Sequence, residues 1–124
     1  MKKEFKINKG EREIVRSYVE LIRPFLSGLR PREADVFAEI LYRYYLKRDI
    51  TNQRDRMALV LNSDSRDEMV DQLEMTHPIF RNAMTSLRKK NILKEGNVIP
   101  EVYLVDLSKG KLDLTFNFKV ISHD

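Results

Sequence analysis

The sequence has 124 residues, no cysteine and no long apolar run. Without cysteine, the chain has no disulfide framework and no thiolate metal site. No stretch approaches the roughly 18 to 20 apolar residues that a helix needs to cross a bilayer, so we expect no contact with a membrane. The basic N-terminus, Met1 to Lys6, is followed by no apolar core, and we expect no secretory signal. These absences favour a cytoplasmic protein.

Glycine and proline are also scarce, with four residues of each, and they separate predicted elements rather than forming runs. No glycine-rich phosphate loop follows a predicted strand, and the sequence holds no nucleophile elbow. The two histidines, His77 and His123, are far apart in the sequence, which is a poor arrangement for a metal site. We therefore expect no catalytic residues, no cofactor and no metal, and we predict that the protein is not an enzyme.

The composition is that of one globular domain with a heavily charged surface. Hydrophobic residues make up 42% of the chain and charged residues 34%. The net charge of +4 suits a polyanionic partner such as nucleic acid. A mildly basic balance is also common in proteins that bind no polyanion, so the charge alone does not decide the function.

The first half of the chain carries helical periodicity. Apolar side chains recur every three to four residues from about Gly10 to Leu26, and Gly28 follows where a left-handed residue ends a helix. A second amphipathic helix is predicted from Pro31 to about Lys47. The polar segment from Asp49 to Arg56 is predicted to be a loop. The short apolar run from Met57 to Leu61 fits either a strand or a helical turn.

Two further helices are predicted in the middle of the chain. The first runs from about Arg66 to Glu74, with Ser65 as its N-terminal cap. The second runs from about Pro78 to Lys90, with Thr76 as its cap and Asn91 in the left-handed conformation at its end. The two helices are separated by a tight connection without glycine.

The pattern then changes from helical to strand-like. A small hairpin is predicted over Ile92 to Ile99, and two strands over Glu101 to Leu107 and Lys111 to Ile121. A turn at Ser108 to Gly110 would join those two strands. In the last strand, apolar and polar residues alternate over about ten positions.

This order of elements predicts an α+β fold, a winged helix-turn-helix with an extra N-terminal helix and a C-terminal β-hairpin. All 124 residues would form one domain. It would consist of the N-terminal helix at 10–26, a winged-helix core at 29–99 and C-terminal strands at 100–124.

Two motifs carry a resemblance to a known family. Leu29 to Phe37, which reads Leu-Arg-Pro-Arg-Glu-Ala-Asp-Val-Phe, resembles the L-T-P-R-E-A-x-V-L opening of many winged helix-turn-helix proteins. Leu87 to Leu93 is similar to the L-x-K-K-G-L-I segment between recognition helix and wing in bacterial repressors of the multiple-antibiotic-resistance type. Arg30 stands where the family has threonine, and Asn91 where it has glycine. The chain is also similar in style to small winged-helix proteins of bacteriophages.

The resemblance implies a DNA-binding protein of transcription or replication control in a bacterial cell. It also implies that the N-terminal helix joins two copies in a homodimer or larger assembly. On the recognition helix, Arg and Asn in the first half can reach base edges, while Arg and Lys near the end suit phosphates. The same helix face could equally be an ordinary solvated surface or a protein contact. The candidate contacts to double-stranded DNA are Thr76, His77, Arg81, Asn82, Thr85, Arg88, Lys89, Lys90 and Lys94.

The acidic third helix argues against simple DNA binding. Related proteins place the start of this helix near a phosphate backbone, which would repel carboxylates. A second hypothesis is therefore a non-enzymatic structural or adaptor subunit, for example in a phage particle, that uses the same fold for protein contacts. The acidic residues are Asp64, Asp67, Glu68, Asp71 and Glu74, against a single Arg66.

Overall fold

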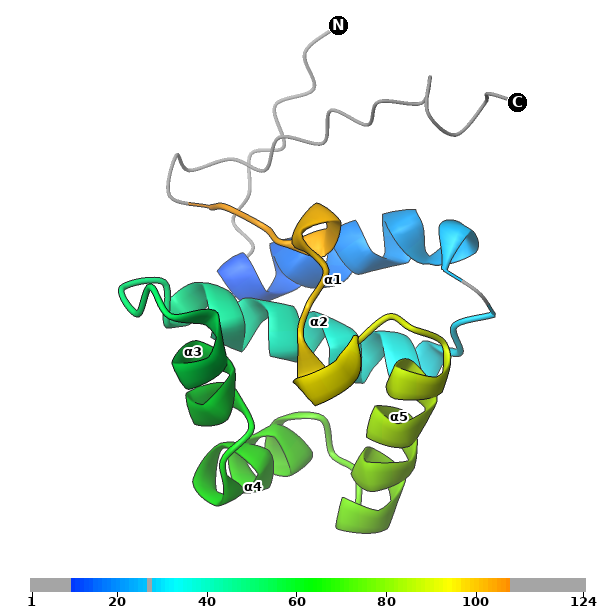
Figure 1. The fold of residues 1–124 in the computed structure, drawn as a ribbon. Helices are drawn as coiled ribbons and strands as arrows, with labels where there is room; N and C mark the ends of the chain where they lie inside the picture. Colours follow the sequence, from blue (N-terminus) through cyan, green and yellow to red (C-terminus); the bar gives the residue numbers. More distant parts are fainter. Residues whose placement is uncertain (1–9, 27, 108–124) are drawn as a thin grey trace, which may run out of the picture.

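The computed structural model describes residues 10–26 and 28–107 of the chain. These residues form helices joined by short connections, with α2 crossing the middle of the molecule (Figure 1). The α-helices are α1 (Glu11–Ile22), α2 (Pro31–Leu46), α3 (Gln53–Val60), α4 (Ser63–Gln72) and α5 (His77–Lys89). Three short 3₁₀ segments are η1 (Arg23–Phe25), η2 (Glu95–Asn97) and η3 (Glu101–Tyr103).

The centre of the core is α2, which packs against α1 on one side and α5 on another (Figure 1). Phe37, Ile40 and Leu41 on α2 are almost completely buried. Burying a side chain of this size stabilises the fold by about 1.5 to 3 kcal/mol. Its predicted start is confirmed, because Pro31 is its first residue and Arg30 its N-terminal cap residue. The αL conformation predicted at Gly28 is also confirmed, with φ of 67°.

The segment predicted to be a loop before residue 57 is largely helical. Helix α3 begins at Gln53, after Asn52, whose side-chain oxygen accepts the N–H of Asp55 at 3.0 Å. The apolar run that follows is the end of this helix, and it buries Met57 and Val60. The asparagine cap and the burial of these two side chains are enough to stabilise two turns of helix. The apolar run itself is too short to show a helical period.

Helix α4 begins earlier than its sequence pattern suggests. The predicted cap Ser65 lies inside the helix, and the cap is Asn62, whose Oδ1 accepts the Ser65 N–H at 2.8 Å. Asparagine and serine are comparable caps, so the pattern alone could not choose between them. Helix α5 agrees with the prediction. Thr76 caps it by accepting the N–H of Ile79 at 3.3 Å, and Asn91 follows it with φ of 60°.

The predicted α+β class is wrong for the described residues, which are mostly helical and form no sheet. The hairpin predicted over 92–99 is reduced to a single bridge between Lys94 and Val98. Ile92, Leu93 and Ile99 are buried in the helical core. Because both ends of the segment are held there, too few residues remain between them to form a ladder of hydrogen bonds between two strands. The wing of a winged helix is therefore not formed as a hairpin.

The strand predicted over 101–107 is also wrong. Residues 101–103 are the 3₁₀ turn η3, and its Tyr103 ring meets the Phe37 ring edge-on, with centroids 5.7 Å apart. A strand needs a second strand to pair with, and within the described residues this segment packs against a helix instead. The strand predicted over 111–121 and the turn predicted over 108–110 lie outside the described residues. No helix in the ranges 10–26 and 28–107 is long and apolar enough to cross a membrane.

Candidate nucleic-acid interface

The outer side of α5 is a continuous row of exposed polar side chains. Its inner side buries Phe80, Ala83, Met84 and Leu87 against the rest of the molecule. Because positions three and four apart share one face of a helix, the remaining polar positions are aligned along the axis. The exposed row consists of Arg81, Asn82, Thr85, Arg88 and Lys89. These are five of the residues expected to contact DNA, and the fold brings them together on one face.

Most of this row is available for an external ligand. Within the described part of the chain, the side chains of Arg81, Asn82, Thr85 and Lys89 make no hydrogen bond or ion pair. Several other arginines are held by the protein itself, as Arg56 is by the carbonyl of Tyr44 at 2.8 Å and as Arg66 is by that of Leu61 at 2.8 Å. Helix α5 also contains no acidic residue to offset its cations.

The C-terminal end of the row continues into the turn at residues 94–98. The guanidinium of Arg88 donates to Oδ1 of Asn97 at 3.0 Å. Lys94 is exposed at the start of this turn. Asn97 was not among the residues expected from the sequence, although the Gly96-Asn97 pair, with φ of 75° and 60°, is a recognisable turn signal. The turn therefore positions Arg88 and adds a cation beyond the helix.

Lys90, another expected DNA contact, is engaged inside the molecule. Its Nζ lies 2.6 Å from a carboxylate oxygen of Glu33 and 2.9 Å from the carbonyl oxygen of Gly28. Burial alone would raise the pKa of Glu33. Hydrogen bonds from the Arg30 N–H, Lys90 and the Ser86 hydroxyl, together with the charge of Lys90, lower this pKa to about 2. The pair fastens the end of α5 to the start of α2.

The N-terminal end of the row meets the acidic helix. The Thr76 hydroxyl already accepts one bond as the cap of α5. The Nε2 atom of His77 lies 3.3 Å from a carboxylate oxygen of Asp67 on α4, and both side chains are exposed. The row on α5 thus runs from an end bordered by carboxylates to an end bordered by Lys94.

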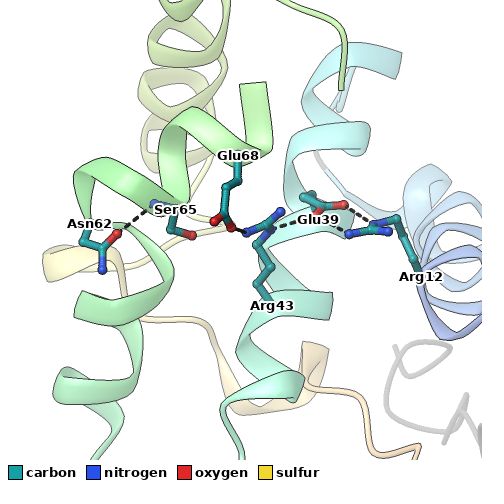
Figure 2. A network of polar contacts seen from close by, with 6 residues as sticks. All are labelled: Arg12, Glu39, Arg43, Asn62, Ser65 and Glu68. Carbon is teal, nitrogen blue, oxygen red and sulfur yellow. Dashed lines mark hydrogen bonds and ion pairs between the residues drawn. The ribbon is translucent and has the colours of Figure 1, made fainter. Parts of the chain in front are cut away.

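A network of ion pairs fixes the orientation of α4 (Figure 2). Glu68 on α4 accepts from Arg43 at 2.7 Å, and Arg43 also donates to the buried Glu39 at 2.8 Å. On the other side, Arg12 of α1 donates to both carboxylate oxygens of Glu39, at 3.0 and 3.3 Å. The network joins α4 to α1 through α2, and the other carboxylates of α4 are exposed.

Comparison with known protein families, characterised proteins and solved structures gives no match to this chain. In the parts of the chain that the structure covers, no group of three or more His, Cys, Asp or Glu side chains could hold a metal ion. The function must therefore be argued from the charged surfaces of α4 and α5.

Proposed function

We propose that the chain binds double-stranded DNA through the outer face of α5, as a non-enzymatic regulator of transcription or replication. The observation that carries this proposal is the row of Arg81, Asn82, Thr85 and Lys89, which is exposed and has no partner within the described residues. Arginine pairs with guanine, and asparagine pairs with adenine, by two hydrogen bonds in the major groove. The row thus combines groups that read bases with groups that bind phosphates.

The arrangement of α4 and α5 supports this proposal. The two helices are joined by four residues and lie at an angle to each other, and α5 lies at one side of the molecule (Figure 1). An α-helix fits into the major groove, where its first half contacts bases and flanking residues contact the backbone. Arg81, Asn82 and Thr85 would read bases, and the cations towards and beyond the helix end would bind phosphates. Those cations are Arg88, Lys89 and Lys94.

The test compares two variants that change the charge equally. Fluorescence anisotropy of a labelled mixed-sequence duplex is recorded over a salt series for each protein. Arg81→Glu with Lys89→Glu should weaken binding at least about tenfold and reduce the salt slope by about 1, because Lys89 loses a phosphate contact and Arg81 loses a base contact. The control is Lys47→Glu with Arg54→Glu, at exposed positions outside α5 whose side chains make no hydrogen bond or ion pair with the described residues. The control should bind like the parent chain. Equal losses in both variants would contradict the assignment to α5.

A separate observation favours a protein contact on α1. Leu21 on α1 is an apolar side chain that is 52% exposed. We propose that a second copy of the chain covers it, since paired recognition helices can contact successive turns of a duplex. Sedimentation velocity of Leu21→Ser should show loss of the dimer, whereas Leu59→Ser on α3 should keep it. An assembly without DNA binding would favour the structural or adaptor role instead.

A further inference from the structure

The outer side of α4 carries a row of carboxylates beside the proposed DNA-binding face. All five acidic residues are exposed. Asp64, Asp67, Glu68 and Asp71 lie on α4 at helical spacing, and Glu74 lies just after its end, in the connection to α5. Asp67 is near His77, and Glu68 is paired with Arg43. The other three make no ion pair with any described residue and keep their charge uncompensated. They are Asp64, Asp71 and Glu74.

These carboxylates lie close enough to α5 to act on a bound duplex. The contact of 3.3 Å between Asp67 and His77 joins the middle of α4 to the first residue of α5. Packed helices have axes about 8 to 10 Å apart. The Debye length at physiological ionic strength is about 8 Å. A phosphate backbone that reaches the start of α5, beside Asp67, would therefore lie within about one Debye length of the nearest α4 carboxylates, and it would feel a repulsion that salt weakens.

The overall charge makes this repulsion important. The described residues contain equal numbers of basic and acidic side chains, and the positive excess of the chain lies in residues 1–9 and 108–124. The row on α5 and its turn contribute four cations, Arg81, Arg88, Lys89 and Lys94, against the three uncompensated carboxylates of α4 and of the connection that follows it. Attraction to an arbitrary duplex is thus weakened at the contact surface.

We infer that the α4 carboxylates suppress binding to DNA of arbitrary sequence, so that a stable complex requires the base contacts of α5. This inference rests on the proposed function of α5. Binding to arbitrary DNA depends almost entirely on phosphate contacts, whereas base contacts depend on hydrogen bonds of defined geometry. Repulsion at the backbone weakens both kinds of binding by a similar factor. Only the complex that also has base contacts then stays tight enough to persist.

The test neutralises the row and measures two kinds of duplex. The variant is Asp64→Asn, Asp71→Asn and Glu74→Gln. Its matched control carries the same change in charge at exposed acids away from α4, as Glu13→Gln, Asp49→Asn and Glu101→Gln. The probes are a random-sequence duplex and the duplex pool that the parent chain enriches from random sequence. Anisotropy titrations at fixed physiological salt give the affinity for each probe.

The α4 variant should bind both duplexes about tenfold more tightly than the parent chain, so that the random duplex also forms a stable complex at physiological salt. The control should gain less than about threefold, because its charges lie further from the contact surface. Equal gains in the two variants would overturn the role of α4 and leave DNA binding through α5 standing. A failure of all three proteins to bind either probe at low salt would overturn both.

Discussion

The carboxylate of Glu39 lies 2.8 Å from Nε of Arg43 and 3.0 Å from Nε of Arg12, and its side chain is completely buried (Figure 2). One acidic group in the core therefore pairs with two guanidinium groups from different helices, and Glu68 shares one of them, that of Arg43. Removing one partner of a buried ion pair leaves charge without compensation, and this costs more than the pair itself contributes.

Glu39→Ala should therefore lower the free energy of unfolding by about 3 to 5 kcal/mol. Urea unfolding followed by circular dichroism measures this difference. Glu20→Ala is the matched control, because Glu20 is 56% exposed and pairs with Arg23 at 3.2 Å on the surface of α1. The control should lose less than about 1 kcal/mol. A similar loss in both variants would mean that the network contributes no more than a surface pair.

Glu33 gives a pH dependence with a defined sign. Its pKa is about 2 in the folded chain and 4.5 in the reference state, so the folded state favours the charged carboxylate. The resulting stability is fully present above pH 4.5 and is lost as the pH falls through that value towards 2. Urea unfolding of the parent chain and of Glu33→Gln should differ by at most about 3 kcal/mol at neutral pH. The difference should shrink in acid, and a constant difference from neutral to acidic pH would contradict the assignment.

The assignment of Asn62 as the N-terminal cap of α4 can also be tested by mutation. Asn62→Ala removes the side-chain acceptor of the Ser65 N–H and should cost about 1 kcal/mol of stability. Ser65→Ala leaves this bond intact, because the donor is the backbone. If Ser65 were the cap, as its spacing to Glu68 suggests, the order of the two losses in urea unfolding would be reversed.

The sequence pattern predicts the features that depend only on residues close to one another in the chain. Helices α2 and α5 were predicted within one residue of their ends, because each has a long apolar period, a proline in its first turn and a clear stop. The exposed row on α5 was predicted for the same reason, since a helix that buries one side must expose the other. Helix α3 was missed because two turns show no reliable period.

Other features depend on contacts between distant parts of the chain. Tyr103 contacts Phe37, and this long-range contact gives residues 101–103 a turn where alternation suggested a strand. Lys90 resembles a surface lysine in the sequence, but its partner Glu33 is 57 residues away. Neither partner can be recognised from the local pattern, and the DNA contact of Lys90 stays a prediction.

The hydrogen bond between Arg88 and Asn97 allows the positioning of Arg88 to be tested separately from the stability of the fold. Asn97 has φ of 60°, so Asn97→Ala would combine the loss of the side chain with backbone strain. Asn97→Gly tolerates this backbone and removes only the acceptor of the Arg88 hydrogen bond. Because the bond is exposed, the glycine variant should keep its unfolding free energy within about 0.5 kcal/mol of the parent chain. With Arg88 no longer held, its affinity for the mixed-sequence duplex should fall severalfold in anisotropy titrations. An affinity equal to that of the parent chain would mean that the turn does not position Arg88 for DNA.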